Sequence, residues 1–475
     1  MSAPCGNELK AVADFFSIQL GFDPKSYDKQ DPFIVVTLEN EKQAKQITSR
    51  TVLVRSVYNY WAEGTSREEL YQNIKQLKDT FKEAYCSPSR SFKINIESYN
   101  LKQDFQTIPK RLQELAEHAN LDLQGPVSLS SPDVSFYFLE YYGSQGTKPL
   151  AKKLYFGTWV ADGQKHLVQR YDLKKRHYIG NTSMDARLSL LVSNLALAGP
   201  GSWVLDPFVG TGSLLVACAH YGAYVTGTDI DYKIIHGFGK SSSHKKKFRG
   251  PDENFLANLR QYGLEDLYLD VLVGDASKHA MWRRSSLFDA IVTDPPYGIR
   301  EYTVKIDSKK RNPENKIQAQ EDEDIDMVEK GHDVCEKQTS YAGSQKSDYQ
   351  LQDIVKDLLN FAAKFLKLGG HLVYWLPVYR PDYTEEMVPS HPCLKLISNC
   401  EQTITLKMSR RLITMQKCRE DTELLDAAHI PEMLYKERLR DKYFEANPEN
   451  DKKKKKKKKH RGAGECDTES VNQPT

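Results

Sequence analysis

Residues 203–215 read WVLDPFVGTGSLL. The first part, WVLDPF, predicts a strand, and GSLLVACAHYG, which begins inside the stretch, predicts a helix. Gly210 and Gly212 lie at the junction, where the lack of a Cβ lets backbone approach a ligand closely. A dinucleotide-binding fingerprint would need a third glycine, but Leu215 stands at that position. Asp206 ends the strand, and its carboxylate would repel a pyrophosphate and attract an ammonium group.

Strands and helices alternate regularly around this stretch. The pattern starts near residue 175 with a helix in NTSMDARLSLLVSNLA, whose predicted N-cap is Asn181, Thr182 or Ser183. Such alternation is typical of an α/β fold with a doubly wound, mainly parallel sheet, which binds ligands beyond the carboxyl ends of its strands. The further predicted elements are the strands AYVTGTDI, YLDVLVGDA, FDAIVT and HLVYWLPV and the helices ENFLANLRQYG and DIVKDLLNFAAKFLKLGG.

Two further acids end the next two predicted strands. Asp229 in GTDID follows Asp206 by 23 residues, and Asp275 lies in VGDAS. Asp229 is suited to accept hydrogen bonds from both hydroxyls of a ribose, and Asp275 from an adenine amino group. Each acid alone would equally suit a helix N-cap or a turn. Three acids in register with a glycine loop favour a ligand that joins an amino-acid moiety to one nucleoside, and S-adenosylmethionine is such a ligand.

The fourth strand, FDAIVT, ends in Asp294-Pro295-Pro296-Tyr297. An exocyclic amino nitrogen on a base is a poor nucleophile because its lone pair is conjugated with the ring. Two acceptors on its N–H groups draw it toward tetrahedral geometry, and the Asp294 carboxylate and the Pro295 carbonyl suit this role because the prolines hold them rigidly. Tyr297 offers a flat face to an extruded base. Alone, the motif would also suit a proline-rich turn, but its place after three strand-end acids favours amino-group methylation.

The composition excludes other classes of protein. No apolar run reaches the roughly 18 residues of a membrane span, and the N-terminus lacks the pattern of a targeting segment. The eight cysteines never form C-x-x-C, which argues against a zinc site or a disulfide framework. No metal is therefore predicted, and a reducing compartment is. Residues 451–475 carry a net charge of +5 within a total of +3, so nucleic-acid binding would need local basic patches. The candidate patches are Lys152-Lys153, Lys174 to Arg176, Lys245 to Arg249 and Arg410-Arg411.

Four regions are predicted along the chain. Residues 1–88 form an N-terminal α+β region. Residues 89–160 form a small α+β module with the strands FKINIES, VSFYFLEYY and KLYFGTWVA and the helix IPKRLQELAEHA. Residues 161–445 hold the doubly wound domain, with a polar insertion at 301–347 that is predicted to be disordered. Residues 446–475 form a disordered lysine-rich tail.

With these motifs in hand, the chain resembles class I S-adenosylmethionine-dependent methyltransferases that act on amino groups. Over roughly residues 90–445 it is similar to the catalytic subunits of the eukaryotic tRNA (guanine-10-N2)-methyltransferases. The stretches that carry this similarity are RHYIGNTSMDA, DPFVGTGSLL, ACAHYGAYVTGTDIDY, RGPDENFLANLRQYGL, DPPYGIRE, YWLPVY and SRRLITM.

The resemblance implies a Rossmann-like seven-stranded sheet, preceded by a THUMP-type RNA-binding module at 89–160. It implies methylation of the N2 of guanosine 10 in cytoplasmic tRNA, with S-adenosylmethionine as cofactor. It also implies a heterodimer with a small zinc-binding activator subunit, expected to dock on exposed apolar residues of an edge strand near 203–226.

The resemblance also assigns residues by position. Asp294, Pro295, Pro296 and Tyr297 would hold the target guanine. In the implied cofactor-binding set, Thr182 and Ser183 shape the lid, Asp206, Gly210 and Gly212 hold the methionine part, Asp229 holds the ribose and Asp275 the adenine, with Phe208, Ile230 and Ala276 as neighbours.

Two other functions stay open from the sequence. A DNA adenine-N6 or cytosine-N4 methyltransferase would also use D-P-P-Y, although the α+β module and the lack of an obvious sequence-reading domain disfavour it. A non-catalytic RNA-binding scaffold would keep the sheet with degenerate motifs, whereas each expected acid and glycine is present here.

Overall fold

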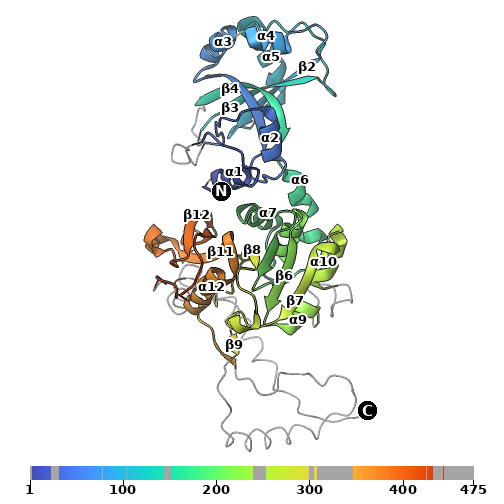
Figure 1. The fold of residues 1–475 in the computed structure, drawn as a ribbon. Coiled ribbons are helices and arrows are strands. Elements are labelled where there is room, and N and C mark those ends of the chain that lie inside the picture. The colour runs from blue at the N-terminus through green and yellow to red at the C-terminus, as the bar shows by residue number, and fades with distance from the viewer. Residues whose placement is uncertain are drawn as a thin grey trace, which may run out of the picture. The chain divides into compact units, whose positions relative to one another are not determined.

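The structure is a computed structural model that describes residues 3–22, 31–77, 79–102, 104–143, 151–238, 253–298, 304–306, 346–423, 425–431 and 442. It contains two compact units. Unit 1 comprises residues 1–179 and 183–199, and unit 2 comprises residues 180–182 and 200–475 (Figure 1). None of the helices in the described ranges combines the length and the apolar character that crossing a membrane requires.

Unit 1 is built on a four-stranded sheet in the order β1-β4-β3-β2. β4 runs antiparallel to both of its neighbours, and β2 and β3 are parallel. The three strands predicted within 89–160 are confirmed as β2, β3 and β4, while β1 comes from before residue 89. The sheet thus draws on both predicted N-terminal regions, and their limits stay a prediction. The elements of unit 1 are α1 (Ala3–Phe15), α2 (Glu41–Thr48), β1 (Ser56–Gly64), α3 (Arg67–Lys75), α4 (Asp79–Tyr85), β2 (Phe92–Tyr99), η1 (Phe105–Thr107), α5 (Ile108–Ala119), β3 (Val134–Tyr141), β4 (Lys153–Asp162), α6 (Lys165–Arg170), η2 (Leu173–Lys175) and α7 (Ala186–Leu195).

The core of this sheet lies against α3, α4 and α5. Leu70, Phe81 and Leu115 from these helices are buried in one cluster with Phe136 and Phe156 from β3 and β4. The rings of Phe136 and Phe156 are stacked with their centroids 5.7 Å apart. Burial of these large apolar side chains is the main force that joins the helices to the sheet.

A buried carboxylate fastens α1 to the rest of unit 1. Glu8 accepts hydrogen bonds from the backbone N–H groups of Val52 and Leu53, both at 2.9 Å, and from the side-chain amide of Asn194 at 2.8 Å. Asn194 also accepts from Arg50 Nε at 3.2 Å. Burial raises the pKa of Glu8, while these hydrogen bonds oppose the shift. Helix α7, which carries Asn194, therefore belongs to the same unit as the N-terminal helix.

Unit 2 contains a seven-stranded sheet in the order β12-β13-β11-β8-β5-β6-β7 (Figure 1). The pairs from β11 to β7 are parallel, and β13 is antiparallel to both β11 and β12. The predicted doubly wound, mainly parallel sheet is confirmed. The elements of unit 2 are β5 (Trp203–Asp206), α8 (Ser213–His220), β6 (Tyr224–Asp229), α9 (Tyr232–His236), α10 (Phe255–Tyr262), η3 (Glu265–Leu267), β7 (Tyr268–Val273), η4 (His279–Met281), β8 (Phe288–Thr293), β9 (Val304–Ile306), β10 (Lys346–Asp348), α12 (Leu351–Phe365), β11 (Leu366–Tyr379), η5 (Arg380–Asp382), η6 (Glu385–Met387), β12 (Leu394–Thr403) and β13 (Met408–Lys417).

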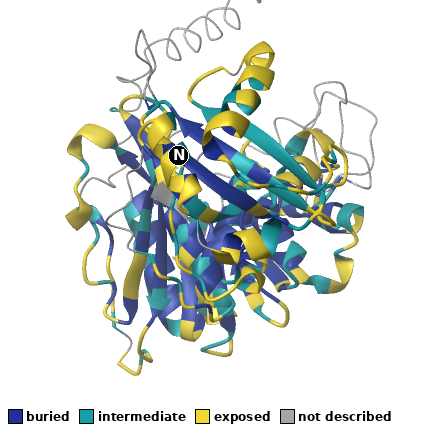
Figure 2. Ribbon diagram, turned by 90° about the horizontal axis from the view of Figure 1, so that it is seen from above, coloured by how far each residue is buried: buried dark blue, intermediate teal, exposed yellow. Residues whose placement is uncertain are grey.

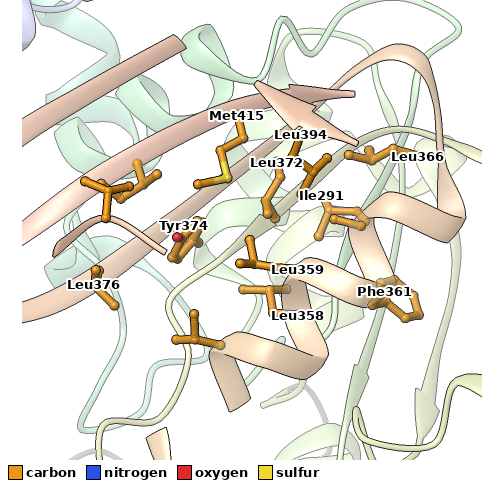
Figure 3. Packing of buried hydrophobic residues seen from close by; sticks show 14 of the residues in the cluster. Ile291, Leu358, Leu359, Phe361, Leu366, Leu372, Tyr374, Leu376, Leu394 and Met415 are labelled. Carbon is orange, nitrogen blue, oxygen red and sulfur yellow. The ribbon is translucent and has the colours of Figure 1, made fainter. Parts of the chain in front are cut away.

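The core of unit 2 lies between this sheet and α12. Figure 3 shows Leu358 and Leu359 of α12 on one side of the cluster, and Ile291, Leu372 and Met415 of β8, β11 and β13 on the other. Figure 2 shows buried residues running along the strands and exposed residues on loops and outer helix faces. A close-packed interior of this kind holds the strand ends in fixed positions.

Two local predictions were wrong. The helix predicted through Gly370 ends at Phe365, and β11 begins at Leu366. The N-cap of α7 is Asp185, because its carboxylate accepts the free N–H groups of Arg187 and Leu188. Within or next to the insertion predicted to be disordered over 301–347, β9 and β10 pair antiparallel, with Val304 opposite Asp348, and the disorder of the insertion stays a prediction. The rest of this insertion and the lysine-rich tail lie outside the described residues.

Candidate active site

The glycine loop joins β5 to α8 in the conformation that its sequence predicts. Gly210 and Gly212 have φ angles of 50° and 76°, in the region that side chains rarely adopt. A Cβ on Gly212 would lie 2.0 Å from Cδ2 of Phe255, so this glycine is required by packing. A Cβ on Gly210 would meet no heavy atom of the described residues within 4 Å. The backbone at Gly210 therefore faces open space that a ligand can occupy.

Asp229 connects the ends of three neighbouring strands. Its Oδ2 accepts the N–H of Gly210 and its Oδ1 the N–H of Asp231, both at 2.9 Å. Its carbonyl oxygen accepts the N–H of Gly274, in the loop after β7, at 2.9 Å. In that same loop Asp275 is buried and accepts the N–H of Ser277 at 2.9 Å. The predicted cofactor acids of β6 and β7 thus lie at one edge of the sheet, next to the glycine loop.

Asp206 has a strongly raised pKa at this edge. Its carboxylate is buried, and Oδ1 accepts the N–H of Phe208 at 3.0 Å and the hydroxyl of Thr293 at 2.8 Å. Burial raises its pKa to about 7; the two hydrogen bonds oppose the shift, and the charges of Asp229 and Asp294 add to it. A buried carboxyl group that two neighbouring carboxylates repel favours a cationic ligand.

The D-P-P-Y loop follows β8 directly. Asp294 Oδ1 accepts a short hydrogen bond from the hydroxyl of Tyr297, and Oδ2 forms an ion pair with Arg410 Nη1 at 3.1 Å. Burial raises the pKa of Asp294, while Arg410 and then Tyr297 oppose the shift. Pro295 is buried and Pro296 is half-buried. The loop therefore presents a carboxylate whose orientation is restrained from two sides.

Burial also raises the pKa of Tyr297 well above its ordinary value, and the charge of Asp294 adds to the shift. Its hydroxyl is thus a permanent donor to Asp294 near neutral pH, a contact that the sequence did not reveal. The predicted stacking role of its half-buried ring stays a prediction.

The remaining predicted cofactor residues are placed as follows. Ile230 and Ala276 are half-buried beside Asp229 and Asp275. Thr182 and Ser183 precede the N-cap of α7, and the division between the units falls between them. Their predicted part in a cofactor lid stays a prediction.

The predicted basic patch at Arg410-Arg411 is not free surface, whereas Lys152 and Lys153 are exposed. Arg410 pairs with Asp294, and Arg411 donates to Asn399 Oδ1 at 2.8 Å and lies 3.9 Å from Glu401. In unit 1, Lys153 pairs with Asp31 at 2.7 Å. The patch at Lys245 to Arg249 lies outside the described residues.

Sequence reasoning missed Thr293 and Arg410 as parts of the site. The role of Thr293 could have been predicted, because a hydroxyl residue next to the motif can reach a neighbouring strand end. Arg410 carries no such signal, since it lies 116 residues beyond Asp294. Only the sheet register brings the two together: Thr293 pairs with Tyr374 of β11, and Pro377 of β11 pairs with Arg410 of β13.

The edge strand was predicted wrongly. β5 and β6, the two strands that lie in or overlap residues 203–226, are inside the sheet, and β7 is the edge strand on that side. Exposed apolar residues are nevertheless present there: Trp203 and Tyr224 form a directly paired couple across β5 and β6, and Leu269 and Leu272 are exposed on β7.

Comparisons with known proteins give a consistent result. Residues 6–165 match the model of the Tmrp11 THUMP N-terminal domain, and residues 174–312 match the RMKL-like methyltransferase domain. The chain is 44% identical to tRNA (guanine(10)-N(2))-methyltransferase TRMT11 of Xenopus laevis over 93% of this chain and 89% of the relative. It is 46% identical to the Homo sapiens protein of the same name over 87% of this chain and 85% of the relative.

Among solved structures, TrmN from Thermus thermophilus aligns with a TM-score of 0.36 and 16% identity, over 79% of this chain and 86% of that chain.

Proposed function

The chain belongs to the family of the TRMT11 tRNA (guanine(10)-N(2))-methyltransferases, and on that premise we propose that it methylates the exocyclic N2 of guanosine 10 in tRNA, using S-adenosylmethionine. The observation that carries the proposal is the fixed Asp294 carboxylate at the end of β8, in the same sheet as the glycine loop. An amino group needs an acceptor of this kind to turn its lone pair toward an electrophile.

The proposed chemistry at D-P-P-Y is positioning rather than proton relay. Asp294 accepts one N–H of the guanine amino group, and the carbonyl of Pro295 accepts the other. The two prolines restrict the backbone, so both acceptors keep their geometry without reorganisation. Tyr297 donates to Asp294, and Pro296 and the Tyr297 ring border the base. Most of the rate enhancement then comes from orientation and electrostatics.

The residues of the cofactor edge fit S-adenosylmethionine. The open space at Gly210 admits a ligand against the backbone, and the carboxyl groups of Asp206, Asp229 and Asp294 favour a cationic one. When bound, this cofactor supplies an activated methyl group. Asp206 with Gly210 would face its methionine part.

Further along the edge, Asp229 with Ile230 would face the ribose, and Asp275 with Ala276 the adenine. Phe208, Gly212 and Thr182, all of unit 2, would lie beside the cofactor. A carboxylate has about four acceptor positions, so Asp229, which accepts from the N–H groups of Gly210 and Asp231, would offer its remaining acceptor capacity to the ribose hydroxyls.

Two macromolecular partners belong to the proposal. Unit 1, which matches a THUMP model, would bind the tRNA. A small zinc-binding activator subunit would dock at β7, the edge strand of the described sheet, where Leu269 and Leu272 are exposed. Trp203 of β5 and Tyr224 of β6 are further exposed apolar residues. A cytoplasmic location is proposed on the same family premise.

The test compares the full chain, co-expressed with its activator, with two variants. Asp294→Ala should lower methyl transfer to unmodified tRNA by at least about 100-fold, as the loss of one preorganised polar group does elsewhere, while the cofactor still binds in calorimetry, with an affinity that falls far less than turnover. Asp289→Ala is the matched control, because this acid lies at the opposite end of β8 and pairs with Lys367.

Mass spectrometry of the digested tRNA should show N2-methylguanosine with wild type and with Asp289→Ala. No label on guanine N2 with the wild-type protein, or label on duplex DNA instead, would overturn the proposal.

A further inference from the structure

Arg410 is fixed on three sides within unit 2. Nη1 lies 3.1 Å from Asp294 Oδ2, and Nε donates to Gln402 Oε1 at 2.6 Å. The guanidinium carbon lies 4.1 Å from the ring centroid of Trp375. Only 16% of the side chain is exposed. A planar guanidinium held by a stacked ring and two hydrogen bonds has little freedom to turn, so its position fixes that of the carboxylate it contacts.

The anchors of Arg410 come from separate strands. Gln402 pairs with Arg410 in the register of β12 and β13, and Trp375 lies on β11. Asp294 follows β8. Arg410 therefore links the antiparallel end of the sheet to the parallel strand that leads into D-P-P-Y. An ion pair that only stabilised a single element would not need contacts with several strands.

Charge makes this contact consequential for Asp294. Burial favours the protonated carboxyl, and the charge of Asp206 on β5 interacts unfavourably with that of Asp294. Against these act Arg410 from β13 and the hydroxyl of Tyr297 from the loop, with Arg410 the larger effect. A protonated Asp294 would lose acceptor capacity toward an amino group.

We propose that Arg410 is a positioning residue for methyl transfer, which holds Asp294 as an oriented anion able to accept an N–H of the target guanine. The inference rests on the proposed function of Asp294. It assigns the SRRLITM segment to the catalytic machinery rather than to an RNA-binding basic patch.

The test uses the full chain with its activator and the variants Arg410→Gln, Arg410→Lys and Arg411→Gln. Arg411 is the matched control, because it is equally well anchored one residue away and contacts Asn399, Glu401 and Tyr383 instead of Asp294. The readout is kcat for tRNA methylation between pH 5.5 and 9, with cofactor affinity measured in parallel.

In the plot of kcat against pH, the fall of kcat on the acidic side is called here the acid limb. Arg410→Gln should move the acid limb to higher pH by about one unit or more, and turnover at pH 7 should fall about tenfold or more. Arg410→Lys should return the limb toward wild type, because the charge is restored, but recover turnover only in part. Arg411→Gln should leave the limb in place.

An unmoved limb in Arg410→Gln with an active wild type would overturn this inference and leave the proposed function standing. So would a raised KM for tRNA with a flattened salt dependence, which would identify Arg410 as a phosphate contact.

A second measurement does not depend on activity. In a double-mutant cycle of Arg410→Gln and Asp294→Asn, followed by urea unfolding, the coupling between the two residues should be present at pH 8 and disappear at acidic pH, where Asp294 is protonated. A coupling near zero at pH 8 would overturn the inference even if no substrate were methylated.

Discussion

Thr293 donates its hydroxyl hydrogen to Asp206 across 2.8 Å, and both residues are buried. Thr293 ends β8 and Asp206 ends β5. The bond therefore joins the strand that leads into D-P-P-Y to the strand that leads into the glycine loop. This hydrogen bond also opposes the rise in the pKa of Asp206. It therefore links the geometry of the two loops to the charge of Asp206.

Thr293→Val is expected to weaken cofactor binding while it leaves the fold intact. The substitution nearly preserves shape but removes the donor, and a hydrogen bond to a charged group contributes about 1.5–3 kcal/mol. Cofactor affinity at pH 7, measured by calorimetry, should fall about tenfold or more. Thr293→Ser keeps the hydroxyl and should bind nearly as well as wild type. Equal affinity in the valine and serine variants would show that the bond does not matter.

The stability of the ligand-free protein should depend on Asp206 through pH. Its pKa is about 7 in the folded protein and roughly 4 in an unfolded chain. Folding thus favours the protonated form, so this contribution to stability is present at acidic pH and is lost as the pH rises from about 4 to about 7. Asp206→Asn should flatten the fall in melting temperature over this range.

The informative quantity in that experiment is the difference between wild type and Asp206→Asn. The pKa values of Glu8, Asp229 and Asp294 are raised too, so they tilt both curves in the same direction. Parallel curves for the two proteins would contradict the expected titration of Asp206.

Gly210→Ala should lower cofactor binding without a specific loss of stability. Gly210 has a positive φ and open space in front of it. Gly263, the C-cap of α10, shares both properties away from the site, so Gly263→Ala carries a similar backbone strain of roughly 1 kcal/mol. Both variants should melt at similar temperatures, and only Gly210→Ala should lose affinity in calorimetry. Normal binding by Gly210→Ala would mean that the space belongs to no ligand.

The β7 edge should be needed for assembly with the activator subunit. Leu269→Lys with Leu272→Lys puts charge on the exposed apolar surface of this strand, and co-purification of the two proteins should fall. The matched control is Leu396→Lys with Ile397→Lys, because these residues are similarly exposed on β12, the opposite edge of the same sheet. Loss of assembly in the control pair alone would move the docking surface to β12.

Elements with a strong local pattern were predictable. The strands β5, β6, β7 and β8 and the helices α8, α10 and α12 show the apolar periodicity of their class, and each lies where that pattern indicates. The boundaries were less predictable. Asp185 caps α7 because a carboxylate one residue before the first turn reaches two free N–H groups, and a run of cap-forming residues does not reveal which one will do so.

What the sequence by itself determined is the order of elements and the identity of the acids at the strand ends, since parallel strands bring their carboxyl ends to one edge of a sheet. Only the tertiary structure decided that Arg410 faces Asp294, that Thr293 bonds to Asp206, and that β7 rather than β5 or β6 is the edge. The physical reason is that strand order and register come from the packing of segments far apart along the chain, whereas periodicity and strand endings are local properties.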